Sequence, residues 1–134
     1  MAVRLLAAVA TAILRGMLKA LLRAMRPRQW AKNVFVFAAL VFDEQLVRPE
    51  PLVRTVVGFA MLCLISSSVY LLNDIADVEA DRRHPVKRTR PIAAGELAIP
   101  VAVTAAVLLA AISVMISFGL GNSFGWIVAG YFGL

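Results

Sequence analysis

The stretch TVVGFAMLCLISSSVYLLN, residues 55–73, contains no charged side chain. A run of roughly 18 or more mostly apolar residues predicts a helix that crosses a bilayer, because a helix satisfies its backbone polar groups internally. The rest of the chain has the same character, since 61% of its 134 residues are hydrophobic and its mean hydropathy is +0.84. The sequence therefore predicts an all-α, polytopic transmembrane bundle, in which this span covers residues 54–73.

A first span is expected before this one, at residues 30–47. Its uncharged core, residues 33–42, is too short to cross a bilayer alone. If Trp30 anchors at the membrane interface and the helix continues to Val47, the segment is about 27 Å long. Lys32 would then reach toward the interface or face a polar cavity.

The final uncharged stretch, residues 97–134, is too long for one span, at about 57 Å of helix. Gly119, Gly121 and Gly125 predict a break, and we interpret them as turn residues. Spans at residues 99–118 and 124–134 follow, the second of them incomplete. We expect the chain to be the N-terminal part of a longer protein, truncated after about three and a half spans.

Residues 1–25 form a separate unit ahead of the membrane domain, residues 26–134. A polar and mainly cationic stripe recurs at steps of four and seven, opposite Leu6, Ile13 and Met17, which predicts a basic amphipathic helix lying at the membrane interface. A signal peptide is disfavoured because cations interrupt the apolar region. The stripe consists of Arg4, Thr11, Arg15, Lys19 and Arg26.

The net charge of +6 does not indicate nucleic-acid binding, because most cations flank apolar runs. The N-terminal segment and the loop at residues 82–90 are rich in Lys and Arg, whereas the loop between the first two spans has only Arg48 and Arg54. Positive-inside bias then predicts a multi-pass protein of the plasma (inner) membrane, with the N-terminus and the 82–90 loop in the cytoplasm. The single cysteine, Cys63, excludes an internal disulfide.

The segment NDIADVEAD, residues 73–81, places carboxylates at the cytoplasmic end of the second span. Asp74, Asp77 and Asp81 are three and four residues apart, so they share one face of a helix. Grouped carboxylates repel one another unless a cation lies among them, and hard oxygen ligands suit Mg²⁺. The alternative is a solvated helix end with alternating charges. Glu79 points away and is left out of the metal set.

The segment HPVKRTRP, residues 84–91, follows a few residues later and supplies cationic side chains that can donate hydrogen bonds to phosphate. Lys87, Arg88 and Arg90 lie in an extended loop restricted by two prolines. Carboxylates and cations at one membrane surface predict a site for Mg²⁺ and diphosphate. Lys32 and Asn33 belong to the same pocket or anchor the first span at the interface.

These segments, with RPRQWAKN at residues 26–33, resemble the UbiA-type intramembrane transferases, in particular their decaprenyl-phosphate phosphoribosyltransferase branch. The resemblance implies a Mg²⁺-dependent enzyme of about nine spans, with two facing Asp-rich motifs. Enzymes of this branch transfer a phosphoribosyl group from phosphoribosyl diphosphate to a polyprenyl phosphate, toward the arabinose donor for cell-wall arabinan, and the resemblance implies the same reaction here. Asn73, Asp74, Asp77 and Asp81 would hold metal and diphosphate, and Lys87, Arg88, Arg90, Asn33 and Lys32 would contact substrate.

Two alternatives remain open at the level of sequence. A prenyltransferase of the same superfamily, acting on an aromatic or lipid acceptor, would use the same Mg²⁺ site. A non-catalytic membrane fragment is the other, because the chain contains no second Asp-rich motif. We therefore expect residues 1–134 alone to be inactive.

Overall fold

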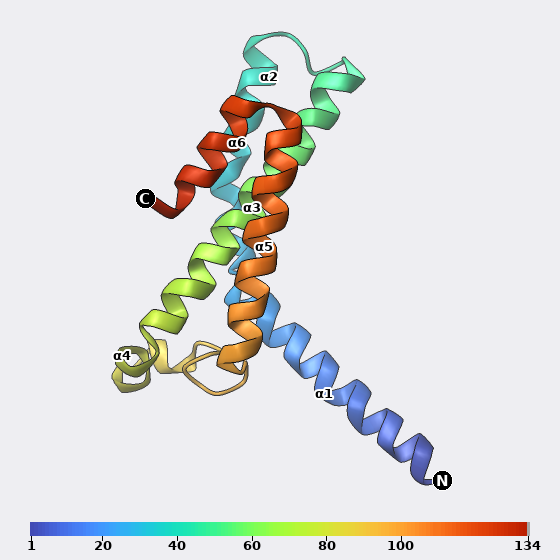
Figure 1. The fold of residues 1–134 in the computed structure, drawn as a ribbon, viewed down its shortest axis with the longest axis vertical. Helices are drawn as coiled ribbons and strands as arrows, with labels where there is room; N and C mark the ends of the chain where they lie inside the picture. Colours follow the sequence, from blue (N-terminus) through green and yellow to red (C-terminus); the bar gives the residue numbers. More distant parts are fainter. Residues whose placement is uncertain (134) are drawn as a thin grey trace.

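The computed structural model describes residues 1–133. Within this range the chain is helical and has no strand, which confirms the predicted all-α class. Among residues 1–133, three helices are long and apolar enough to cross a membrane, namely α1 (Ala2–Ala24), α3 (Pro49–Ala76) and α5 (Ile99–Leu120). Figure 1 shows α3 and α5 side by side, with α1 projecting away from them. The chain is a membrane protein.

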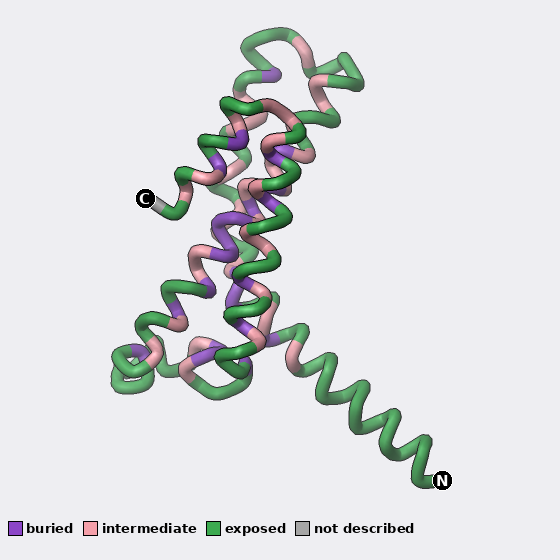
Figure 2. Tube along the Cα trace, viewed as in Figure 1, coloured by how far each residue is buried: buried purple, intermediate pink, exposed green. Residues whose placement is uncertain are grey.

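The α3–α5 pair forms the centre of the molecule, and small side chains line its interface. Ser68 on α3 and Ala102 and Ala106 on α5 are buried, so the two backbones approach closely. The Ser68 hydroxyl donates to the Ala106 carbonyl at 2.8 Å. Ser68 is therefore a packing residue between the two helices. Figure 2 shows the buried positions concentrated along this contact.

Helix α3 extends beyond the predicted span at both ends. It begins at Pro49, where proline favours the first helical turn and holds Arg48 extended (φ −91°, ψ 122°). Its last residue is Ala76, and Asp77 has bridge-region angles (φ −91°, ψ 4°) before the short helix α4 (Val78–Arg83). The carboxylate motif therefore spans two helices instead of one continuous helix.

The segment expected to form a span at residues 30–47 differs from that expectation. It consists of 3₁₀ turns, η1 (Pro27–Phe37), followed by the short helix α2 (Ala38–Phe42). The helix ends there because Glu44 adopts a left-handed conformation (φ 54°) and Gln45 N–H turns back to the Leu40 carbonyl at 3.0 Å. A 3₁₀ helix rises about 2.0 Å per residue, so η1 and α2 together still extend about 30 Å.

Trp30 does not have the environment expected of an interface anchor. Its indole N–H donates to the Ser67 hydroxyl on α3 at 3.0 Å, and the side chain is partly buried. The Ser67 hydroxyl also lies 3.2 Å from the Met25 carbonyl, at the end of α1. One α3 residue therefore connects the two preceding segments to the bundle.

The predicted break after the third span is confirmed. Helix α5 ends at Leu120, and α6 (Asn122–Ala129) turns back along it before the 3₁₀ turn η3 (Gly130–Gly133), as Figure 1 shows. Gly121 lies at the turn, as predicted. Gly125 instead lies within α6, where a Cβ atom would be 2.5 Å from the Phe118 ring. Residue 134, the end of the expected fourth span, lies outside the described residues.

Candidate functional site

The end of α3 carries two buried carboxylates. The Asp74 and Asp81 side chains are each only 2% exposed. Seven residues separate them, so they return to nearly the same side of the chain across the α3–α4 junction. Carboxylates removed from water need cationic partners or hydrogen-bond donors to remain charged.

Arginines from two distant segments supply those partners. Arg90 Nη1 lies 3.1 Å from Asp74 Oδ1 and 2.7 Å from Asp81 Oδ2, so it bridges the two carboxylates. Arg26 Nη2 donates to Asp74 Oδ1 at 2.5 Å, and its guanidinium lies 4.7 Å from the centre of the Tyr70 ring. Lys87 Nζ lies 4.0 Å from Asp81 Oδ1. We call Asp74, Asp81, Arg26, Arg90 and Lys87 the charge cluster.

Exposure within the charge cluster is unequal. The carboxylates are buried, whereas the side chains of Arg26, Arg90 and Lys87 are 30%, 27% and 45% exposed. The surface that the charge cluster presents to solvent is therefore mainly cationic. Guanidinium groups held in this way present remaining N–H donors that suit phosphate oxygens.

The loop between α4 and α5, residues 84–97, holds Arg90 in place by its own turns, and we call it the basic loop. The His84 ring nitrogen Nδ1 accepts the backbone N–H groups of Val86 and Lys87, each at 3.2 Å, which gives this histidine a structural role. Gly95 has φ +77°, a conformation that favours glycine, and its N–H bonds to the Ile92 carbonyl at 3.1 Å. The buried Ile92 and Leu97 anchor the loop in the core.

Several residues of the predicted site lie outside the charge cluster. Asn73, Asp77 and Arg88 are exposed, and no ion pair involves them within residues 1–133. Asn33 is directed to Cys63 instead, with Nδ2 3.5 Å from Sγ. Lys32 is exposed on η1 and has no ion-pair partner in the same range. The structure thus brings together Asp74, Asp81, Lys87 and Arg90 of the predicted set.

Sequence reasoning missed Arg26 as a site residue. It was assigned to the cationic stripe of the N-terminal helix, yet it lies just after α1 with left-handed backbone angles (φ 54°, ψ 61°) that aim it at Asp74. The sequence feature that could have indicated this role is the position of Arg26 directly before Pro27, since proline restricts the local backbone and so the direction of a neighbouring side chain.

The predicted metal ligands fit Mg²⁺ in kind. Asp74, Asp77 and Asp81 each keep at least one carboxylate oxygen with no hydrogen bond inside the described part of the chain, and such oxygens are the ligands that Mg²⁺ prefers. They are not gathered, however, because no group of three or more Asp, Glu, His or Cys residues within residues 1–133 is arranged to hold a metal ion. Arginines occupy the remaining oxygens of Asp74 and Asp81.

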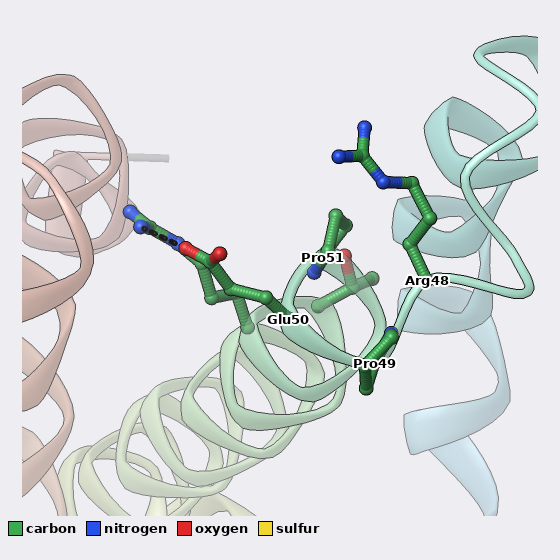
Figure 3. Close-up of a pocket in the computed structure, with 6 residues that line it drawn as sticks. Arg48, Pro49, Glu50 and Pro51 are labelled. Atoms are coloured by element: carbon green, nitrogen blue, oxygen red, sulfur yellow. Dashed lines mark ion pairs between the residues drawn. The ribbon is translucent and has the colours of Figure 1, made fainter.

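A separate surface hollow lies at the other end of α3. It measures about 680 Å³ and lies at the start of α3, around Arg48, Pro49, Glu50 and Pro51 (Figure 3). Asp74 lies 23 residues beyond Pro51 on α3, about 35 Å away along the helix axis. Arg54 in this hollow is already engaged by Glu50 at 3.8 Å and by the Leu120 carbonyl. This hollow is therefore separate from the charge cluster.

Comparison with known proteins identifies the family of this chain. The UbiA prenyltransferase family matches residues 33–134, which is most of the chain. This chain belongs to the UbiA prenyltransferase family. The matched region of this UbiA chain contains the carboxylates and Arg90 but begins after Arg26.

Three relatives of this UbiA chain carry the same name, decaprenyl-phosphate phosphoribosyltransferase. The relative from Mycolicibacterium smegmatis is 41% identical over 125 residues, covering 87% of this chain and 38% of its own length. The Corynebacterium glutamicum relative is 43% identical over 100 residues, which cover 73% of this chain and 30% of the relative. The relative from Mycobacterium tuberculosis strain H37Rv is 48% identical over 91 residues, which cover 65% of this chain and 30% of the relative. The chain thus spans about a third of the length of these relatives.

Proposed function

We propose that this chain forms the donor-binding part of a decaprenyl-phosphate phosphoribosyltransferase. The reaction moves a phosphoribosyl group from phosphoribosyl diphosphate to a polyprenyl phosphate at the cytoplasmic face of the plasma membrane, toward the lipid-linked arabinose donor of cell-wall arabinan. The observation that carries the proposal is the charge cluster, in which buried Asp74 and Asp81 hold Arg26 and Arg90 with part of each guanidinium open to solvent. The names of the three relatives support the choice of substrates.

The chemistry requires stabilisation of a leaving diphosphate. The bond between the anomeric carbon of the ribose and the diphosphate oxygen breaks, and its electron pair leaves with the diphosphate. A lipid phosphate oxygen forms the new bond to that carbon. Arg26, Arg90 and Lys87 would bind the diphosphate, because preorganised cations stabilise charge that develops on the leaving group. The attacking phosphate is already an anion, so the reaction needs no strong general base.

Magnesium is the cofactor that we propose for this site. When bound, Mg²⁺ neutralises diphosphate charge and acts as a Lewis acid on its oxygens. Asp74, Asp77 and Asp81 would hold it, and Asn73 would contact the diphosphate beside it. Lys32, Asn33 and Arg88, which lie outside the charge cluster, would contact the donor or the acceptor phosphate.

A transfer assay tests the proposal. Membranes that contain this chain within a polypeptide of the relatives' full length receive phosphoribosyl diphosphate labelled in the ribose, together with decaprenyl phosphate. We expect label in the organic extract, dependent on both decaprenyl phosphate and Mg²⁺. Transfer of a prenyl chain from a prenyl diphosphate to an aromatic acceptor, with no ribose label in lipid, would replace this proposal with the prenyltransferase alternative. Residues 1–134 assayed alone should give no transfer.

A further inference from the structure

Helix α1 has an apolar stripe that is only partly covered. Leu6, Ile13 and Ala20 recur every seven residues, so they lie on one face with a drift of about 20° per step. Ala20 is 2% exposed and packs in the core, as does Ala24. Leu6 and Ile13, at the other end of the same stripe, are 70% and 59% exposed. The stripe therefore continues from the protein core onto a surface that residues 1–133 leave exposed, as Figure 2 shows for α1.

The opposite side of α1 is cationic. No acidic residue precedes Asp43, and Arg4, Arg15 and Lys19 have no ion-pair partner within residues 1–133. A groove of about 450 Å³ runs along this side with leucines between cations at its rim. Its lining residues are Arg15, Leu18, Lys19, Leu22, Arg23 and Pro27. A helix with an apolar stripe on one face and unpaired cations on the opposite face is suited to lie on an anionic phospholipid surface.

The end of α1 and the residues just after it contact the basic loop and the charge cluster. Arg23 pairs with Glu96 at 2.5 Å and donates to the Thr89 carbonyl at 3.3 Å, so it holds the basic loop on both sides of Arg90. Arg26, three residues later, pairs with Asp74. Helix α1 and the two residues after it thus connect the uncovered stripe to the basic loop through Arg23 and to Asp74 through Arg26.

We propose that α1 docks on an anionic phospholipid surface, and that this docking holds Arg23 and Arg26 against the basic loop and Asp74. The lipid surface then controls the geometry of the charge cluster. Lipid docking orders α1, and the ordered helix presents both arginines in the positions that their partners require. The proposal goes beyond the proposed function, and neither of its tests uses phosphoribosyl diphosphate.

The first test measures docking in the whole chain. In a Cys63→Ala background, Ile13→Cys carries an environment-sensitive fluorophore, and the protein is reconstituted in phosphatidylcholine vesicles with or without phosphatidylglycerol. We expect a blue-shifted emission only with phosphatidylglycerol. Each cation near an anionic surface contributes about fivefold to binding, so the R4Q/R15Q/K19Q variant should dock about a hundredfold less favourably. The charge-preserving R4K/R15K variant is the control and should behave as the parent.

Three outcomes of this test would overturn the proposal. Emission that is the same in both lipid mixtures would show that anionic lipid does not recruit α1. Quenching by probes at the bilayer centre would show that α1 crosses the membrane, for which it is long and apolar enough. Energy transfer between labelled copies in both mixtures would show that a second copy covers the stripe.

The second test measures coupling to the basic loop by hydrogen–deuterium exchange. Backbone exchange at residues 84–97 should slow severalfold when phosphatidylglycerol is added. Glu96→Gln removes the partner of Arg23 but leaves α1 unchanged, so the Ile13 signal should persist while the lipid dependence of exchange is lost. Equal exchange of the basic loop in both lipid mixtures would refute the coupling, even if α1 docks.

Discussion

At the scale of single residues, Arg90 shows how charge is distributed in this membrane protein. One nitrogen of its guanidinium lies within hydrogen-bond distance of both Asp74 and Asp81. The carboxylates are more deeply buried than the arginine, so they position the cation, and their ion pairs with it offset part of the cost of burying them. Removing one partner of such a pair leaves an uncompensated buried charge, which costs more than the pair itself contributes.

Arg90→Gln should therefore destabilise the protein in a way that depends on Asp81. Breaking a fully buried pair costs about 3–5 kcal/mol, and we expect less here because Arg90 is partly exposed and Arg26 and Lys87 remain. Thermal unfolding in detergent should show a lower midpoint for R90Q, and the D81N/R90Q double variant should lose less than the sum of the single variants. Arg83→Gln, an exposed change on α4, is the matched control. An R90Q midpoint equal to that of R83Q would contradict the bridging role.

A substitution at Asp77 can test metal binding without affecting stability, whereas substitutions at the buried Asp74 and Asp81 would affect both. Its side chain is exposed, and it takes no part in the charge cluster. Asp77→Asn should leave the unfolding midpoint unchanged, whereas in the transfer assay it should lower turnover by tenfold or more and raise the Mg²⁺ concentration required, because a metal ligand is lost. Glu79→Gln, two residues away and also exposed, should change neither quantity. Normal turnover in D77N would remove Asp77 from the metal set.

At the scale of elements, small residues decide how closely helices approach. Ser68 and Ala106 bring α3 against α5, and Gly125 brings α6 against the end of α5. A Cβ at position 125 would lie 2.5 Å from the Cδ1 and Cγ atoms of Phe118, near the base of its side chain. The Phe118 ring also packs edge-on against Trp126, with ring centres 5.3 Å apart. The ring therefore has little freedom to move away.

Two glycine substitutions give opposite expectations. Gly125→Ala should destabilise the α5–α6 hairpin by about 1–3 kcal/mol through overpacking. Gly119→Ala, near the end of α5, meets no atom within 4 Å and should be neutral or stabilise by up to about 1 kcal/mol, since alanine is the better helix former. Unfolding midpoints of both variants in the same detergent provide the comparison. A G125A midpoint at or above that of G119A would show that the hairpin is not packed as described.

At the scale of the whole molecule, the charge cluster and the Arg48 turn lie at opposite ends of α3. A helix of 28 residues is about 42 Å long, which exceeds the hydrocarbon core of a bilayer. If the charge cluster is cytoplasmic, cysteine at position 83 should react with a membrane-impermeant reagent only from the cytoplasmic side. Cysteine at position 47, where Val47 is 91% exposed, should react only from the outside. Both variants need the Cys63→Ala background, and the reverse pattern would place the site away from cytosolic substrate.

The sequence by itself determined the helical class and the presence of the two central helices. Two uncharged runs, at residues 55–73 and from residue 97, predicted α3 and α5. They could be recognised because the length and hydropathy of a segment are local properties that decide whether it can span a bilayer. The break near Gly121 was equally legible. The bulk of the candidate site was predictable for a similar reason, since Asp74, Asp81, Lys87 and Arg90 lie close together in the chain. The segment at residues 30–47 was not, because its 3₁₀ turns depend on packing against α3 rather than on composition.

Only the tertiary structure decided which charges meet. Arg26 and Asp74 are 48 residues apart, and no periodicity relates them. Their contact depends on where α1 ends, on the left-handed backbone of Arg26 and on the burial of Ala24 against the core. Tertiary packing also placed Asp74 and Asp81 inside and Asp77 outside, although one helix would have put all three on a single face. The burial of a side chain depends on neighbours that are distant in the sequence. Because Asp74 and Asp81 are buried while their cationic partners are partly exposed, the surface of this site is cationic although the sequence motif is acidic.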